Sequence, residues 1–141
     1  SLSLGEIMTK PETIFWKKLR KKLPRGSHAH IIRVENPAHP GTPDVNMCIN
    51  GVEVWPEVKR VKDFPKGEDT PVFTGVMRAE QRLWHKERSK AGGRSYLVGL
   101  VESEEVIYVI PGSYIMEFEK MSRKRLDELN LPLEAMWAPS P

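Results

Sequence analysis

The sequence predicts a mixed α/β domain in which a central β-sheet is flanked by helices. Three observations lead to this prediction: helical periodicity in three segments, apolar or alternating runs in five others, and an Asn50-Gly51 pair between two of those runs. The predicted order along the chain is helix, three strands, helix, two strands and helix. A chain of 141 residues is long enough for one domain with its own apolar core.

Composition and charge limit the class of protein. Apolar residues make up 39% of the chain and charged residues 29%, and no apolar run reaches the length that spans a membrane. The N-terminal segment lacks the apolar stretch of a signal peptide, and Cys48 is the single cysteine. We therefore expect an intracellular, reducing setting and no secretion. We expect the domain to span residues 8–141, with residues 1–7 as added or unstructured sequence.

The N-terminal part is predicted to form a basic helix followed by a strand. Thr9 is the expected N-cap, and Glu12 occupies the capping-box position three residues later. Between Lys10 and Arg25 the chain holds seven basic residues and one acid. Such a stripe is typical of a protein that binds a polyanion, although a solvated helix face would produce the same pattern. Residues 28–34 alternate loosely and predict the first strand.

The Asn50-Gly51 pair predicts a two-residue hairpin turn. With these two residues as the turn, Asp44 lies opposite Glu57, and Lys59 points to the same side as Glu57. Carboxylates that face each other across a ladder repel, and a divalent cation between them would turn this repulsion into a binding site. Pro56 has no N–H for the ladder, so we expect a bulge or a splaying of the two strands there.

The second half of the chain is predicted to contain a long loop, two helices and two strands. Proline and glycine punctuate the loop, and Gly92-Gly93 closes the first of these helices. The expected segments are a polar loop at 62–75, a helix at 78–91, strands at 96–101 and 106–110, and a helix at 116–129 before a proline-rich tail.

Asp44 and Glu57 are candidate metal ligands. Their carboxylates carry the anionic oxygens that Mg²⁺ and Mn²⁺ prefer. Lys59 can stabilise developing negative charge or help to activate water. An acid-x-Lys triplet is common by chance, so it is the hairpin register and the Pro43-Asp44 pair that indicate a site.

Pro43-Asp44 followed by Glu57-Val58-Lys59 resembles the signature of the PD-(D/E)XK nuclease superfamily. Three further features are similar to the virus-type replication-repair nucleases (the VRR-NUC family), including stand-alone phage versions. These features are the string Gly41-Thr42-Pro43-Asp44, an acid on the first helix at Glu12, and Gln81 near the start of the helix after the hairpin. The match covers approximately residues 12–101, most of the chain.

The resemblance implies a restriction-endonuclease-like fold and hydrolysis of DNA phosphodiester bonds with Mg²⁺, for which Mn²⁺ can substitute. It implies metal binding by Asp44, Glu57 and the backbone carbonyl of Val58, with Glu12 completing the shell, although capping alone explains Glu12. It also implies branched DNA, a flap or a Holliday junction, as the substrate in replication, repair or recombination, and a homodimer as the active form. The implied catalytic residues are Asp44, Glu57, Lys59 and Gln81.

One face of the predicted helix at 78–91 carries polar and aromatic residues that a nuclease could use. Gln81, Trp84, His85 and Arg88 share this face by their spacing. Gln81 would point to the metal, and His85 or Arg88 to phosphate, whereas a merely amphipathic helix would pack Trp84 and leave the others in solvent. The expected contacts to the DNA backbone are Lys17, Lys18, Lys21, Lys62, Arg78, His85 and Arg88.

Two other functions compete with a nuclease. A noncatalytic nucleic-acid-binding module would keep the fold and the basic stripe, but the intact Asp44, Glu57 and Lys59 argue against it. A metal-free structural protein would leave both the basic stripe and the Gly-x-Pro-Asp string without an explanation.

Overall fold

The computed structural model describes residues 10–34 and 38–139, with side chains described from residue 16 onward. The expectation for residues 1–7 concerns a segment outside this range. None of the described helices is long and apolar enough to cross a membrane.

A five-stranded mixed sheet forms the centre of the molecule, with the strands in the order of the chain. The first three strands are antiparallel neighbours, the third and fourth are parallel, and the last two are antiparallel. The parallel pair is connected through a helix, as parallel neighbours require. The strands are β1 (Ala29–Arg33), β2 (Val45–Ile49), β3 (Val52–Val61), β4 (Ser95–Val101) and β5 (Val106–Pro111).

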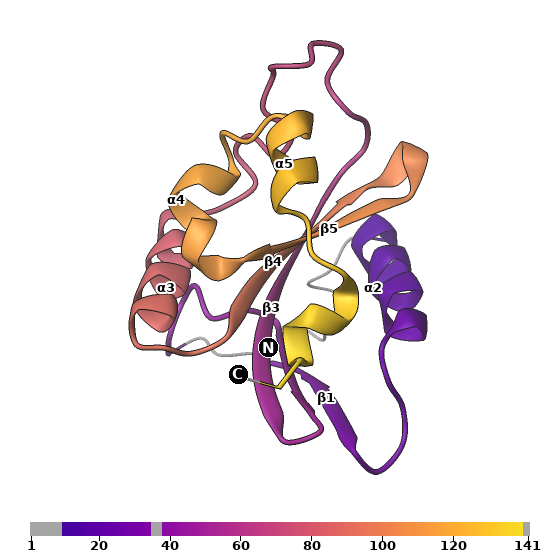
Figure 1. Cartoon of the computed structure of the whole chain (residues 1–141), viewed down its shortest axis with the longest axis vertical. Helices are drawn as coiled ribbons and strands as arrows, with labels where there is room; N and C mark the ends of the chain where they lie inside the picture. The colour runs from indigo at the N-terminus through magenta and orange to yellow at the C-terminus, as the bar shows by residue number, and fades with distance from the viewer. Residues whose placement is uncertain (1–9, 35–37, 140–141) are drawn as a thin grey trace.

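Helices cover both faces of this sheet, which confirms the predicted fold class (Figure 1). The N-terminal helix lies on one side, and the crossover helix with its C-terminal neighbours lies on the other. We call these sides the α2 face and the α3 face. The helices are α2 (Lys10–Lys22), α3 (Ala79–Lys90), α4 (Ile115–Phe118) and α5 (Arg123–Leu129), joined by the short 3₁₀ segments η1 (Glu102–Glu104), η2 (Gly112–Tyr114) and η3 (Leu133–Trp137).

The predicted hairpin register is confirmed next to the turn. Ile49 pairs with Val52 and Met47 with Val54, and both turn residues have positive φ, as a two-residue turn of this type requires. The antiparallel pairing stops at Met47 and Val54. Asp44 lies outside β2, so the expected pairing of Asp44 with Glu57 across the ladder does not form.

Pro56 lies just beyond the point where β3 stops pairing with β2 on one edge and starts pairing with β4 on the other. From Trp55 to Val61 the strand pairs in parallel with β4, and the N–H of Trp55 donates to the carbonyl of Arg94 at 3.0 Å. Successive N–H groups of a strand point to opposite edges, so the nitrogen of Pro56 points toward β2. Because β2 no longer pairs there, the missing N–H breaks no ladder hydrogen bond. The expected splaying of the hairpin is confirmed.

The predicted C-terminal helix at 116–129 is wrong as a single element. It is divided into α4 and α5, and the residues between them include Ser122. The Ser122 side chain accepts a hydrogen bond from the N–H of Arg125 at 3.2 Å and so caps the start of α5. The following proline-rich tail is also structured, because η3 returns to the sheet and buries Met136 on the α2 face.

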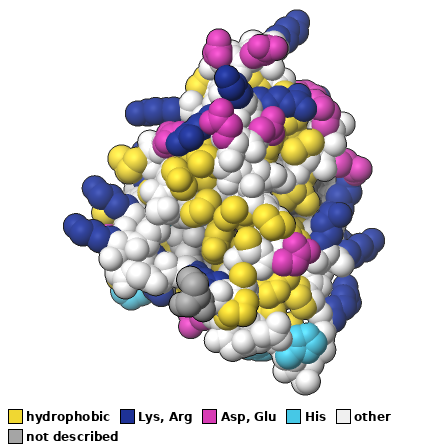
Figure 2. All heavy atoms as spheres, viewed as in Figure 1, with side chains coloured by type: hydrophobic (Ala, Val, Ile, Leu, Met, Phe, Trp, Pro, Cys, Tyr) yellow, Lys and Arg dark blue, Asp and Glu magenta, His cyan; other side chains and the backbone are white. Residues whose placement is uncertain are grey.

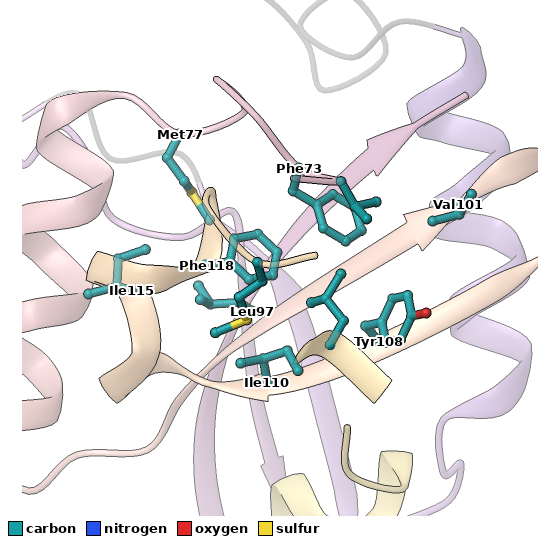
Figure 3. Packing of buried hydrophobic residues seen from close by; sticks show 11 residues of the cluster. Phe73, Met77, Leu97, Val101, Tyr108, Ile110, Ile115 and Phe118 are labelled. Carbon is teal, nitrogen blue, oxygen red and sulfur yellow. The ribbon is translucent and has the colours of Figure 1, made fainter. Parts of the chain in front are cut away.

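The apolar core has two parts, one on each face of the sheet. The α2 face packs residues of α2, the first three strands and η3, among them Leu19, Met47, Val54 and Met136. The α3 face packs the loop before α3 against β4, β5, α4 and α5 (Figure 3). The residues labelled there are Phe73, Met77, Leu97, Val101, Tyr108, Ile110, Ile115 and Phe118.

Gly99 allows the loop before α3 to lie directly on the sheet. A Cβ atom at Gly99 would meet the Cζ atom of Phe73 at 2.4 Å. Phe73 in turn stacks on Phe118, with ring centroids 5.0 Å apart. Gly99 pairs with Lys59 in the parallel ladder, so this close contact lies beside the candidate site.

Candidate active site

The strand β3 presents its charged residues on the α3 face of the sheet. Val54 and Val58 pack into the core of the α2 face, whereas Val61 packs on the α3 face. Because side chains alternate along a strand, Glu57 and Lys59 point to the α3 face with Val61. The predicted shared side of Glu57 and Lys59 is confirmed. Glu57 is 2% exposed, so its carboxyl group is buried between the sheet and α3.

The helix α3 supplies a polar partner to each of these charged residues. The Lys59 ammonium donates a hydrogen bond to Oε1 of Gln81 at 3.1 Å. Nε2 of His85 lies 3.1 Å from Oε1 of Glu57, within hydrogen-bond distance. We call these four residues the β3–α3 polar cluster. Gln81 and His85 are the buried residues of α3.

The two contacts follow from the matching geometry of a strand and a helix. Residues two apart on a strand are separated by about 6.6 Å on one face. Residues four apart on a helix are separated by about 6 Å along one side. Glu57 contacts the later helical residue, His85, and Lys59 contacts the earlier one, Gln81. This reversed order places α3 antiparallel to β3, as a crossover between parallel strands requires.

Gln81 has a second contact that holds its side chain in place. Its Oε1 atom also accepts a hydrogen bond from the backbone N–H of Arg78, the residue before α3, at 2.9 Å. This contact occupies one of the N–H groups that have no partner within the helix. The same oxygen therefore caps the helix and holds the ammonium of Lys59.

The Gly-x-Pro-Asp loop lies directly against the start of α3. Gly41 has φ of +95°, and a Cβ atom there would lie 2.3 Å from the carbonyl oxygen of Glu80. The other end of the loop is held by the residue that follows β1, because the carbonyl of Asp44 accepts a hydrogen bond from the N–H of Val34 at 2.8 Å. Glycine at this position thus lets the loop bring Asp44 to the β3–α3 polar cluster.

The electrostatics of Asp44 place it beside that cluster. Partial burial and the nearby negative charge of Glu57 raise the pKa of the Asp44 carboxyl, while Arg33, Lys59 and Arg78 oppose the increase. The expected repulsion between the two acids is therefore present, although it acts between a loop and a strand.

A hard divalent cation fits this arrangement chemically. The carboxylates of Asp44 and Glu57 and the backbone carbonyl of Val58 carry oxygen atoms of the kind that Mg²⁺ prefers, and these residues would hold such an ion. In the part of the chain that the structure describes, no group of three or more His, Cys, Asp and Glu side chains could hold a metal ion. Glu12 lies in α2, and its side chain is outside the described ones.

The lysines of α2 are not part of the polar cluster. Lys17, Lys18 and Lys21 are exposed on a helix that packs on the opposite face of the sheet, and basic side chains gather along this edge of the molecule (Figure 2). Lys18 also pairs with Glu105 at 2.9 Å. By contrast, Arg78 is exposed close to Asp44, and Lys62 is exposed directly after β3.

Two of the expected DNA contacts have other partners. His85 is 0% exposed and contacts Glu57, so its expected contact to phosphate is corrected to a buried contact with an acid. Arg88 is half-buried over the rings of Trp84 and Trp55, with its guanidinium carbon 4.8 and 5.8 Å from their centroids. The four-residue spacing of Gln81 and His85 indicates that both can contact one strand, but the sequence does not show which strand that is.

The sheet of this protein, with helices on both faces and a parallel pair at β3 and β4, matches the restriction-endonuclease-like fold. Neither a protein-family model nor a curated protein matches the sequence. Among solved structures, the chain is similar to Hjc, a Holliday junction resolvase from the archaeal hyperthermophile Archaeoglobus fulgidus. The TM-score is 0.58 with 18% sequence identity, covering 91% of this chain and 96% of that chain. The predicted fold is thereby confirmed.

Proposed function

We propose that this protein is a metal-dependent endonuclease of the PD-(D/E)XK type that hydrolyses phosphodiester bonds in branched DNA. The observation that carries the proposal is a buried carboxylate at Glu57, with Lys59 on the same strand face and Asp44 beside it. Burial of a carboxylate lowers the stability of a fold unless the group has a partner. A bound cation would be such a partner, so a buried acid at this position indicates a functional site. The resemblance to VRR-NUC proteins, including phage forms, supports the same assignment.

The metal would be held by the carboxylates of Asp44 and Glu57 and the carbonyl of Val58, with Glu12 as a further candidate. When bound, Mg²⁺ or Mn²⁺ supplies positive charge that polarises the phosphoryl group. Lys59 contributes a second positive charge where negative charge develops on the phosphate. Gln81 holds the Lys59 ammonium through its hydrogen bond, which limits the positions that this charge can take.

Exposed basic residues near the polar cluster would bind the DNA backbone. Arg78 and Lys62 are the nearest candidates, because one lies at the start of α3 and the other follows β3. Lys17 and Lys21 on α2 would extend the contact along a second edge of the molecule. Contacts of this kind give affinity that decreases steeply with salt and that does not depend on base sequence.

The substrate class is proposed from the fold and from the family resemblance. The similarity to a Holliday junction resolvase supports a four-way junction as the first substrate to test, with a flap as the second. A homodimer would place one polar cluster at each of two strands of a junction that is itself symmetric. The setting we propose is DNA recombination or repair inside the cell.

The test is a cleavage assay with labelled junction, flap, duplex and single-stranded DNA in Mg²⁺, Mn²⁺ or chelator. Asp44→Asn and Lys59→Met are expected to reduce cleavage of branched DNA at least about 100-fold. The matched controls are Asp69→Asn and Lys124→Met, which make the same chemical changes at exposed positions on the loop before α3 and on α5. Light scattering on the same preparations measures the number of subunits.

The outcomes separate the candidate functions. Cleavage that persists in chelator, or in the Asp44→Asn variant, contradicts a metal-dependent reaction at this site. Binding of junction DNA without cleavage under every condition supports the noncatalytic module instead.

A further inference from the structure

His85 is a buried residue to which the proposed reaction assigns no step. It lies on the second turn of α3, is 0% exposed and is in hydrogen-bond contact with Glu57, itself 2% exposed. If the ring served packing alone, an apolar side chain would fill the same space without the cost of burying polar atoms. Its polar atoms therefore indicate what it does.

The partners of the two ring nitrogens determine which one carries the proton. Nε2 lies 3.1 Å from Oε1 of Glu57, whereas Nδ1 is buried with no hydrogen-bond partner. With the proton on Nε2, the ring donates to the carboxylate, and only an acceptor is left without a partner. With the proton on Nδ1, a buried donor would lack an acceptor, and the lone pair of Nε2 would face the carboxylate oxygen.

The ring is held in this position from two sides. Its helix is anchored one turn earlier by Gln81, which contacts both Lys59 and the N–H of Arg78. The neighbouring Trp84 ring meets the His85 ring edge to face, with centroids 5.1 Å apart. The direction of the Nε2–H bond toward Glu57 is thus set by the fold.

We propose that His85 is a positioning residue, which holds the Glu57 carboxylate through its Nε2–H group in the orientation that binds a divalent cation. This inference rests on the proposed function, since it assumes that Glu57 is a metal ligand. A hydrogen bond to one oxygen restricts rotation of the carboxyl group, so less order has to be imposed when the cation binds. Residues that hold metal ligands in this way affect metal affinity by about 10- to 100-fold when they are replaced.

Two substitutions separate the hydrogen bond from the packing of the ring. His85→Gln keeps an N–H donor at a similar distance from the backbone, whereas His85→Leu keeps apolar volume and removes the donor. Titration of the DNA-free protein with Mn²⁺ by calorimetry is expected to show about 10- to 100-fold weaker binding for His85→Leu. His85→Gln is expected to recover most of the affinity, and the exposed Glu87→Gln on the same helix should leave it unchanged.

The same measurement separates failure of this inference from failure of the proposed function. If the wild-type protein binds Mn²⁺ through Asp44 but His85→Leu binds it equally well, the positioning role is overturned and the nuclease proposal stands. Equal losses in His85→Gln and His85→Leu overturn it as well. If the wild-type protein binds no Mn²⁺, or Asp44→Asn binds it unchanged, both proposals fail.

A measurement on the wild-type protein does not depend on how well the variants fold. Long-range ¹H–¹⁵N correlation spectra of the histidine rings distinguish the two neutral tautomers. The expected result for His85 is a protonated Nε2 and an unprotonated Nδ1. The opposite tautomer removes the donor on which the proposal rests and overturns it.

Discussion

The two faces of the sheet use the same strand in opposite ways. On the α2 face, β3 contributes Val54 and Val58 to an apolar cluster. On the α3 face, the same strand contributes Glu57 and Lys59 to the β3–α3 polar cluster, next to the aromatic packing around Phe73 (Figure 3). The comparison shows that apolar packing buries one face of this strand, whereas charged residues with polar partners on α3 occupy the other.

The cost of burial explains why this difference indicates function. A buried ionised carboxylate loses its hydration, which costs several kcal/mol of stability unless partners compensate for that cost. One hydrogen bond from His85 is a small compensation. Residues on the α2 face should therefore control stability, and the polar cluster should control activity.

The largest expected contrast is between Met47→Ala and Glu57→Gln. Met47 is 0% exposed in the α2-face cluster, so its truncation should lower the free energy of unfolding by about 2–5 kcal/mol. Glu57→Gln removes the charge but keeps the shape, so cleavage should fall at least about 100-fold. Stability should be retained or rise, because the cost of burying the charge is removed. Urea denaturation and the junction cleavage assay measure the two effects. A destabilised Glu57→Gln protein would mean that the acid is structural.

The next contrast compares two glycines with positive φ. Gly41→Ala would push a Cβ atom against the carbonyl of Glu80, which should cost about 1–3 kcal/mol and move Asp44 away from the cluster. Cleavage should decrease with it. Gly51→Ala has open space around its Cβ atom, so only backbone strain of about 1–2 kcal/mol is expected, with cleavage retained. If both variants cleave alike, the loop contact does not position Asp44.

A smaller effect is expected where a polar contact on the α3 face lies away from the site. Tyr108 donates a hydrogen bond to Asp127 at 2.8 Å, and burial together with this bond raises the pKa of the phenol. Tyr108→Phe should lower the free energy of unfolding by about 1 kcal/mol and leave cleavage unchanged. A loss of cleavage in the folded variant would show that the polar cluster depends on the whole α3 face.

The smallest expected effect is the pH dependence that Asp44 contributes. Burial and the charge of Glu57 raise the pKa of Asp44 above its ordinary value. Its contribution to stability is therefore present below the ordinary carboxyl pKa and is lost as the pH rises through the raised folded pKa. Near neutral pH without metal, Asp44→Asn should stabilise the protein by less than about 1 kcal/mol, since water screens the charges at this partly exposed residue.

Addition of Mg²⁺ should reverse this order, because a cation that binds only the folded wild-type protein stabilises it by mass action. Thermal denaturation of the two proteins, with and without Mg²⁺, measures both signs. If Asp44→Asn destabilises the metal-free protein near neutral pH, the repulsion between Asp44 and Glu57 is not the dominant electrostatic interaction of Asp44.

Local sequence signals predicted the elements best where the determining residues are neighbours in the chain. The Asn50-Gly51 turn set the register beside it, and the alternation of β3 placed Glu57 and Lys59 on one face. The same signals did not predict the interruption at Ser122, because a single capping hydrogen bond competes there with continued helical periodicity. They extended the hairpin too far toward Asp44, because they contain no information about where the pairing of β2 with β3 ends.

The sequence by itself determined the fold class, the shared face of Glu57 and Lys59, and the one-turn spacing of Gln81 and His85. All of these follow from the fixed periods of strands and helices. Only the tertiary structure decided that α3 lies over β3, so that Gln81 meets Lys59 and His85 meets Glu57. It also decided that Asp44 reaches the cluster from a loop packed on α3. These placements depend on how the helix that connects β3 and β4 packs on the sheet. Contacts between segments so far apart in the chain produce no periodic pattern in the sequence.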